Sequence, residues 1–428
     1  MTESKNGSIP WMGKIPNHWK IKKIKYCGSA TNGLTYSPGQ LRQVGVPVLR
    51  SSNIKNTKLD FADTVYVDSQ TAKDTLLKRG DILICACNGS AELVGKSVYI
   101  EKDNEYSFGS FMKRFRSDLG KFGFYVLNSD VFNYHIPLFS TTTINQLTNK
   151  AFGDIEIPIP PKEEQKQITA FLDDRCQIID QSIEKKSQQL ESLKIYQKSI
   201  IAKIVTTGLN PEALSIDSKI SWIGTIPKHW KVLRLANCFS LVKREPDLSK
   251  PLLTVSIHSG ISDRELGDED RDRKIWFSED RSKYQGIKAG DIVYNMMRAW
   301  QGAFGASVVD GLVSPAYVVM EPKEGIDSKY FEMLFRTPSI MQAIDGISQG
   351  IADFRKRLYW EKARDLLLPV PPYEEQKAIV ESLANMDDVS EVVAKLEQQI
   401  KLLHEYRSSL INAAVTGKLN INEVENVA

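Results

Sequence analysis

Two stretches of the chain carry apolar residues at a seven-residue repeat, the pattern of a helix that packs along another helix. Each stretch follows a Pro-Pro pair, at 160–161 and 371–372, and proline is tolerated in the first turn of a helix. A Glu-Glu pair follows at 163–164 and 374–375, where negative charge favours the positive end of the helix dipole. The pattern therefore predicts one helix over 161–210 and a second helix with a tail over 371–428.

We expect the apolar seams of these two helices to pack on each other, in antiparallel directions. About 40 residues at 1.5 Å each span roughly 60 Å, which is long enough to hold two domains apart. Lys186, Gln197 and Arg407 interrupt the seams with polar side chains. The residues expected to pack are Ile183, Leu190, Leu193 and Ile200 in the first helix, and Val393, Leu396, Ile400, Leu403 and Leu410 in the second.

The regions before the helices, 1–160 and 211–370, have a different pattern. Short apolar, strand-like runs such as 82–85, 97–100 and 316–320 are broken by Gly, Asn and Ser turns, which is typical of mixed helix and strand structure. The sequence therefore predicts an α+β fold with one globular α/β domain in each region.

The chain also repeats itself once, in the segments that bracket each domain. Similarity nearly vanishes between these brackets, so we predict one frame used twice around different contents, an internal pseudo-two-fold repeat. Residues common to both frames are expected to serve packing rather than base stacking. The pairs at an offset of 211 include Trp11 and Trp222, His18 and His229, Trp19 and Trp230, Glu164 and Glu375, and Gln165 and Gln376.

Composition narrows the class of protein. The 428 residues include 42% apolar and 25% charged residues, ordinary values for a folded globular chain. No run approaches the roughly 18 to 20 apolar residues that cross a bilayer, and no signal peptide is visible, so we expect a cytoplasmic protein without a membrane contact. The five cysteines lack C-x-x-C spacing, which favours reduced, mostly buried thiols and no metal site.

Charge is unevenly distributed along the chain. Residues 1–150 carry 20 Lys and Arg against 12 Asp and Glu, residues 361–428 carry 7 against 12, and residues 211–360 carry 21 against 20. A nucleic-acid surface in the second domain would therefore have to come from local clusters of basic residues.

The bracketing motifs resemble those of one family. Trp-x-Gly-x-Ile-Pro-x-His-Trp opens each domain and Pro-Pro-x-Glu-Glu-Gln-Lys-x-Ile closes it, which is similar to the specificity subunits of Type I restriction-modification systems. The resemblance implies two target-recognition domains, at 1–160 and 211–370, that read a bipartite, asymmetric site in double-stranded DNA. It also implies that the helices are a coiled-coil-like spacer.

The same resemblance implies the partners. Two copies of a methyltransferase (modification) subunit are expected to bind this chain, and restriction/translocase subunits to join through them. S-adenosylmethionine, ATP and Mg are then expected on those partners, and no cofactor or metal on this chain, which is expected to be non-catalytic.

Candidate DNA contacts are Lys and Arg for phosphates, and Arg, Asn, Gln, Ser or Thr for base edges, in loops and at strand ends. A single loop residue of this kind is more often solvated or a turn cap, so clusters are more informative than individual residues. The candidates are Arg50, Ser52, Asn53, Asn88, Ser90, Lys113, Arg114, Thr142 and Asn145 in the first domain, and His258, Arg298, Gln301, Arg355, Lys356 and Arg357 in the second.

Two other classes of function stay open. The chain could be a protein-interaction scaffold that binds no DNA, which a salt titration would distinguish. A Mg-dependent nuclease would use Pro246-Asp247 with Asp327 and Lys329, a short pattern that recurs by chance. Methyl transfer is disfavoured because the residue before each Pro-Pro pair is Ile159 or Val370, not Asn or Asp, and no phosphate-binding loop is present.

Overall fold

The structure is a computed structural model, and it describes residues 4–6, 14–103, 105–139, 145–266, 280–350, 356–384 and 387–419. The chain falls into two compact units. Unit 1 comprises Met1–Ser187 with Gln398–Ala428, and unit 2 comprises Gln188–Glu397. Unit 1 is therefore built from both ends of the polypeptide, and the units divide within the long helices rather than at their ends.

The main sheet of unit 1 has four antiparallel strands in the order β12 (Ser97–Tyr99), β10 (Ile82–Cys85), β14 (Met112–Ser117) and β4 (Gly28–Asn32). Side chains alternate between the two faces of a strand. Ile82 and Ile84 enter the larger core, whereas Leu83 and Cys85 enter a second, smaller core. Because both faces of β10 are covered, its sequence is continuously apolar.

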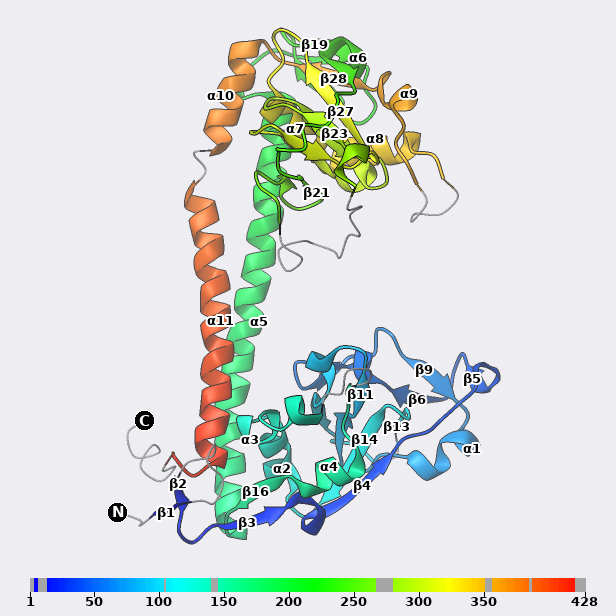
Figure 1. Cartoon of the computed structure of the whole chain (residues 1–428). Helices are drawn as coiled ribbons and strands as arrows, with labels where there is room; N and C mark the ends of the chain where they lie inside the picture. Colours follow the sequence, from blue (N-terminus) through cyan, green and yellow to red (C-terminus); the bar gives the residue numbers. More distant parts are fainter. Residues whose placement is uncertain are drawn as a thin grey trace. The chain divides into compact units, whose positions relative to one another are not determined.

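Smaller elements complete unit 1 (Figure 1). The second four-stranded sheet has the order β13 (Ser107–Phe108), β6 (Val46–Leu49), β9 (Val65–Val67) and β5 (Leu41–Arg42). The two-stranded pairs are β1 (Ser4–Asn6) with β2 (Lys14–Pro16), β3 (Lys20–Lys23) with β16 (Glu156–Ile159), β7 (Ile54–Lys55) with β8 (Lys58–Leu59), and β11 (Cys87–Asn88) with β15 (Asn145–Gln146). The short helices are α1 (Ser69–Ala72), α2 (Gly120–Leu127), α3 (Asp130–Asn133), α4 (Asn149–Asp154) and the 3-10 turns η1 (Ile24–Tyr26), η2 (Pro38–Gln40), η3 (Ser51–Asn53), η4 (Lys73–Thr75), η5 (Ala91–Leu93) and η6 (Ile136–Phe139).

The main sheet of unit 2 has four antiparallel strands in the order β20 (Phe239–Val242), β27 (Tyr317–Pro322), β24 (Ile292–Asn295) and β25 (Phe304–Ala306). This order matches β4, β14, β10 and β12 of unit 1. The strand β24 is buried along its whole length, as β10 is. Each central strand follows a Gly-Asp pair whose aspartate forms an ion pair, Asp81 with Arg116 and Asp291 with Arg244.

The rest of unit 2 also consists of short elements. The two-stranded pairs are β17 (Ser215–Asp217) with β18 (Thr225–Pro227), β19 (Lys231–Arg234) with β28 (Leu367–Val370), β21 (Val255–Ser256) with β22 (Gly260–Ile261), and β23 (Gln285–Ile287) with β26 (Gly311–Val313). The helices are α6 (Leu235–Cys238), α7 (Ser328–Phe335), α8 (Pro338–Ile347), α9 (Trp360–Ala363), α10 (Tyr373–Ala384) and the 3-10 turns η7 (Arg281–Lys283) and η8 (Ala299–Gln301).

Two long helices pass from one unit into the other. The first, α5, runs from Lys162–Thr207, and the second, α11, runs from Asp387–Val415. The sequence pattern predicts one helix from residue 371 onwards, whereas the structure has α10 and then α11, and residues 385 and 386 lie outside the described ranges. Among helices in the described ranges, none combines the length and the apolar character that a bilayer span requires.

Polar side chains link α5 and α11 within each unit, where the two helices lie side by side (Figure 1). In unit 1, Arg407 Nε donates to Asp180 Oδ1 at 2.8 Å, and Lys186 Nζ donates to Gln399 Oε1 at 2.7 Å. In unit 2, Lys194 Nζ donates to Glu397 Oε1 at 2.7 Å, and Gln197 Nε2 donates to Ser390 Oγ at 3.3 Å. The polar residues that interrupt the apolar seams therefore have partners on the facing helix. The nine apolar seam residues are half-buried, and most residues between them are exposed.

The cysteines are free, and three of the five are buried. Burial raises the pKa of the Cys85 and Cys176 thiols to about 11 and that of Cys238 to about 12. Because the thiolate is the reactive form, these three side chains are unreactive at neutral pH. The prediction that most of the cysteines are buried is confirmed.

Candidate nucleic-acid interface

Three candidate segments of unit 1 that are distant in sequence meet at the pair β11 and β15. Asn88 and Asn145 are partners across these two strands. The amide Nδ2 of Asn88 donates to Ser51 Oγ at 3.0 Å, and that of Asn145 donates to the Gly89 carbonyl at 3.3 Å. The segment after β6, the end of β11 with the loop that follows it, and the start of β15 therefore form one polar surface, which we call the unit 1 cluster.

Arg50 and the serines give this cluster charge and exposed hydroxyl groups. The Arg50 guanidinium forms an ion pair with Asp63 at 2.9 Å, is about one-third exposed, and its Nε has no hydrogen-bond partner. Ser52 and Ser90 are exposed. The backbone N–H of Ser90 donates to Asn88 Oδ1 at 3.0 Å, which holds the loop after β11 close to the strand.

Asn53 was predicted as a DNA contact, and the structure contradicts this. Its side chain is fully buried. Its Nδ2 donates to the carbonyls of Asp60 and Asp63 and to Thr64 Oγ1, and its Oδ1 accepts from the Arg50 N–H at 2.9 Å. A buried amide with all its hydrogen-bonding groups engaged holds the loop together and cannot reach a base.

Lys113 was also predicted as a DNA contact, and it too is wrong. The side chain is 1% exposed, on the face of β14 that enters the larger core. Its amine donates to Asn32 Oδ1 at 2.9 Å and to Asn149 Oδ1, so it ties β4 to α4. Burial lowers the pKa of this amine. Its neighbour Arg114 is half-buried on the opposite face, and burial lowers the pKa of its guanidinium too.

Two candidate segments of unit 2 also meet in space. The Leu358 N–H donates to the Met296 carbonyl at 2.8 Å, which brings the segment before η8 next to the segment before α9. The Lys356 ammonium lies 5.2 Å from the centre of the Trp300 ring and forms a 2.7 Å ion pair with Asp345. Around this contact, the unit 2 cluster consists of Arg298 and Gln301, which are half-buried, and Arg357, which is exposed.

His258 lies apart from that contact, on the exposed turn between β21 and β22. Its carbonyl accepts a hydrogen bond from Arg336, and its N–H donates to Ser256 Oγ at 2.9 Å. Thr142 and Arg355, which were also predicted as contacts, lie outside the described residues.

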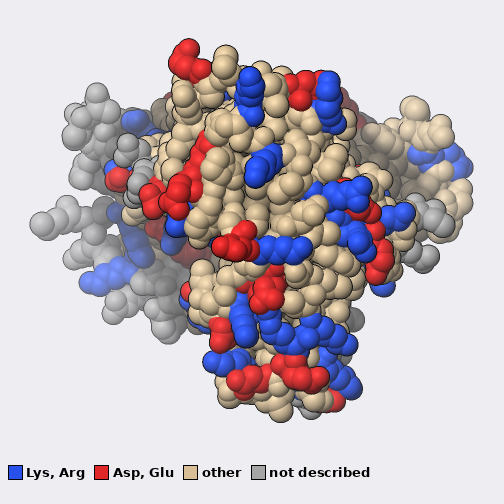
Figure 2. Space-filling view, turned by 90° about the horizontal axis from the view of Figure 1, so that it is seen from above, with Lys and Arg blue, Asp and Glu red and all other residues tan. Residues whose placement is uncertain are grey.

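The surface charge fits local clusters better than one broad basic field. Figure 2 shows Lys and Arg side chains interspersed with Asp and Glu on the face in view. Attraction of a polyanion to such a face depends on where a few basic groups stand free of acidic neighbours.

The frame around each cluster has the same hydrogen-bonded triad. In unit 1, His18 Nε2 lies 2.8 Å from Glu164 Oε2, and Trp19 Nε1 donates to Glu164 Oε1 at 3.0 Å. In unit 2, His229 Nε2 lies 2.7 Å from Glu375 Oε2, and Trp230 Nε1 donates to the same oxygen at 3.1 Å. Both indoles are buried, so they pack in the cores and do not offer a stacking surface.

The remaining frame residues have local roles. Trp222 packs against the core of unit 2, and Trp11 lies outside the described residues. Gln165 Nε2 donates to the Pro160 carbonyl at 2.8 Å, and Gln376 Nε2 donates to the Pro371 carbonyl at 2.9 Å. The glutamate partners of the His-Trp pairs were missed at the sequence level, although the constant spacing between histidine and glutamate in both halves was visible.

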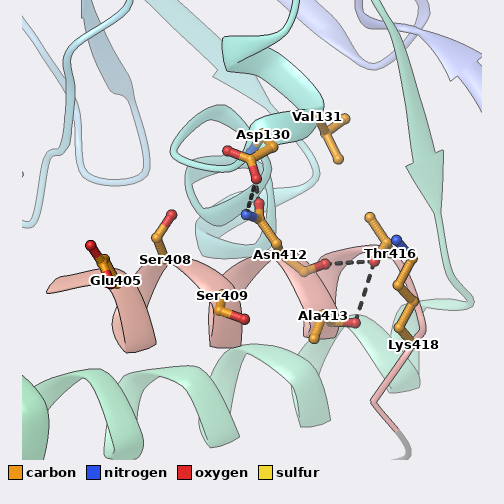
Figure 3. A pocket seen from close by; sticks show the side chains of 9 residues that line it. All are labelled: Asp130, Val131, Glu405, Ser408, Ser409, Asn412, Ala413, Thr416 and Lys418. Atoms are coloured by element: carbon orange, nitrogen blue, oxygen red, sulfur yellow. Dashed lines mark hydrogen bonds between the residues drawn. The ribbon is translucent and has the colours of Figure 1, made fainter. Parts of the chain in front are cut away.

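A pocket in unit 1 lies between α3 and the end of α11 (Figure 3). Asn412 bridges the two helices, because its Oδ1 accepts from the Asp130 N–H at 2.6 Å and its Nδ2 donates to the Asp130 carboxylate. Thr416 Oγ1 donates to the Asn412 carbonyl at 2.6 Å. The polar groups nearest the bridge are therefore engaged in joining α11 to unit 1.

The residues of the nuclease alternative have structural roles. Asp327 caps α7, because its Oδ1 accepts from the Tyr330 N–H at 2.9 Å. Asp247 accepts from Ser249 Oγ at 2.6 Å in a turn. Lys329 forms a 2.7 Å ion pair with Glu332. Both carboxylates are thus accounted for by turn and cap geometry.

Comparison with known proteins points to one family. Residues 16–192 match the family described as Type I restriction modification DNA specificity domain, so this part of the chain is a DNA specificity domain. Beyond this domain, the chain is similar along nearly its whole length to specificity subunits of type I restriction enzymes.

Relatives match along nearly the whole chain. It is 27% identical to a protein of Methanocaldococcus jannaschii described as the MjaX type I restriction enzyme specificity subunit, over 96% of each chain. It is 23% identical to the EcoKI specificity subunit of Escherichia coli, over 95% of this chain and 90% of that one. A solved chain from work on complex assembly and conformational transition of the type I R-M system shares the fold, with a TM-score of 0.64 at 15% identity, covering 95% of this chain and 100% of that chain.

Proposed function

We propose that this chain is the non-catalytic subunit that selects DNA for a Type I restriction-modification complex. In this proposal, the unit 1 cluster reads one half of a bipartite, asymmetric site in double-stranded DNA, and the unit 2 cluster reads the other half. The observation that carries the proposal is the combination of like frames and unlike surfaces. The His-Trp-Glu triad and the strand order recur in both units, whereas the exposed polar residues differ, as two readers of different sequences require.

The helices α5 and α11 are proposed to be an antiparallel spacer between the two target-recognition domains. Support comes from the paired contacts within each unit, where residue numbers fall along one helix as they rise along the other. The half-buried seam adds to this, because a seven-residue repeat is the packing pattern of a coiled coil. The internal pseudo-two-fold repeat is part of the same proposal.

The partners follow from the repeat. Two copies of one frame offer two copies of one protein-binding surface, so we propose that two methyltransferase subunits bind this chain and that restriction subunits join through them. S-adenosylmethionine, ATP and Mg then belong to those partners, and this chain positions them on the DNA.

Exchange of residues 21–157 for the equivalent segment of another specificity subunit tests the proposal. The expected result is a new sequence in one half-site of the methylated motif, with the other half-site and the gap unchanged, as measured by mapping modified adenines. An exchange that alters both half-sites, or neither, contradicts the proposal. In parallel, binding of the complex to its site should weaken steeply between 50 and 200 mM salt, because contacts to phosphates release counterions. Binding without salt dependence would favour the protein scaffold.

A further inference from the structure

An exposed aromatic side chain stands beside the unit 1 cluster. Phe111 lies on the turn between β13 and β14, which is closed by a 2.9 Å hydrogen bond from the Met112 N–H to the Gly109 carbonyl. Its side chain is 67% exposed. Single exposed apolar residues are common on protein surfaces, so the exposure carries weight only because of where the ring stands.

The backbone of this turn is fixed to the segments that carry the cluster. The Phe111 carbonyl accepts from the N–H groups of Ala86 at 2.9 Å and Cys87 at 3.0 Å, and Asn88 follows directly. The Gly109 N–H donates to the Leu49 carbonyl at 3.0 Å, and Arg50 follows directly. The backbone that carries Phe111 is therefore anchored between the segments that carry Arg50 and Asn88.

The frame does not require an aromatic residue here. The equivalent turn of unit 2 precedes β27 and has Ala316, whose carbonyl accepts from the Met296 N–H at 3.3 Å, much as the Phe111 carbonyl accepts from Ala86. A methyl group is enough to build the turn. The frame therefore does not need the benzyl group of Phe111, because the same turn forms in unit 2 without it. We expect the ring to serve a contact that unit 1 makes and unit 2 does not.

We infer that Phe111 is a specificity-determining residue of unit 1, whose ring enters the DNA at one base step of the first half-site. This inference rests on the proposed function. A phenyl ring has no hydrogen-bond group, so what it offers a duplex is an apolar wedge between neighbouring bases. The anchored backbone lowers the entropic cost of placing it. Pyrimidine–purine steps open most easily, so the first half-site is expected to contain such a step next to the bases read by the polar cluster.

The test uses the full chain assembled with its methyltransferase subunits and a duplex that carries the mapped motif. Each position of the first half-site is replaced in turn by 2-aminopurine, whose fluorescence rises when the base loses its stacking. With the wild-type chain, fluorescence should rise at one step only. Phe111→Ala should abolish the rise and weaken binding roughly five- to 150-fold, the range for loss of a stacked aromatic. Phe111→Leu, which keeps an apolar wedge and guards against misfolding, should retain most of the rise.

The control variant is Tyr26→Ala, since Tyr26 is also an exposed aromatic residue of unit 1, at 72%, but stands on η1. It should leave both readouts unchanged. The inference is overturned if Phe111→Ala binds and fluoresces like the wild type, or if no step opens with the wild type. It is also overturned if Phe111→Ala loses only the methyltransferase subunits, which would assign the ring to a protein contact. Complete absence of salt-dependent DNA binding by the wild type would instead refute the proposed function.

Discussion

Glu375 joins two side chains of unit 2 through a single carboxylate oxygen. Glu375→Gln should lower the free energy of unfolding by about 1 kcal/mol, because the neutral amide oxygen is a weaker acceptor for the Trp230 N–H than the carboxylate oxygen that it replaces. Chemical denaturation followed by tryptophan fluorescence measures the change. The matched control is Glu374→Gln, whose side chain is 84% exposed and which should cost less than about 0.5 kcal/mol. Equal losses in the two variants would show that the triad does not stabilise the fold.

The buried amine of Lys113 makes stability depend on pH. Burial lowers its pKa below the usual 10.5, so the unfolded chain binds this proton more tightly than the folded chain does. Stability from this group therefore rises with pH between the lowered pKa and 10.5. The unfolding midpoint of the wild type, measured relative to that of Lys113→Met, should therefore rise as the pH is increased towards 10.5. Parallel pH profiles for the two chains would contradict this.

Sequence reasoning found clusters of candidate contacts better than individual contacts. Residue type predicted Asn53 and Lys113 to lie at the surface, but partners far away in the chain decide whether a polar group can be buried, and Lys113 finds them in Asn32 and Asn149. The meeting of Asn88 with Asn145 depends on strand register, which local pattern does not contain. Phe111 was missed because an apolar residue between two strands is typical of a core.

At the scale of the helix, the seam was predictable because the burial of residues along a helix repeats with the same period as the apolar residues in the sequence. Leu403→Ala should therefore destabilise unit 1 by about 1–2 kcal/mol, since it removes a half-buried side chain. The neighbouring Leu402 is 53% exposed, and Leu402→Ala carries the same change in helix propensity. It should cost less than about 0.5 kcal/mol. Thermal unfolding of both variants separates the effect of side-chain packing from the effect of helix propensity. Similar losses of stability in the two variants would show that Leu403 does not pack in the seam.

For the whole molecule, length and repetition predicted two α/β domains and two long helices, because these features repeat locally in the sequence. The division within the helices was not predictable. The division depends on which of the two cores each helix end packs against, and these contacts join residues that are far apart in the sequence. Ile168 and Leu172 of α5, for example, join Ile411 and Val415 of α11 in the larger core of unit 1.

If the helices set the gap between the half-sites, the gap should grow with their length. Insertion of one heptad into α5 and one into α11 at facing levels adds about 10.5 Å, or roughly three base pairs at 3.4 Å each. Mapping of modified adenines should then show the same two half-sites, separated by a gap that is longer by that amount. An unchanged gap would mean that the length of these helices does not set the distance between the half-sites. Insertion into one helix alone should break the seam register and abolish methylation.

The composition of unit 1 has a consequence for biosynthesis. Its core includes Ile411, Ala414 and Val415, which are translated after the whole of unit 2, and Gly417 sits against Pro16 and Trp19. The nascent first domain must therefore wait, with part of its apolar surface uncovered, while all of unit 2 is translated. A premature stop between unit 2 and Ile411 would thus leave the core of unit 1 incomplete, although most of unit 1 is translated first.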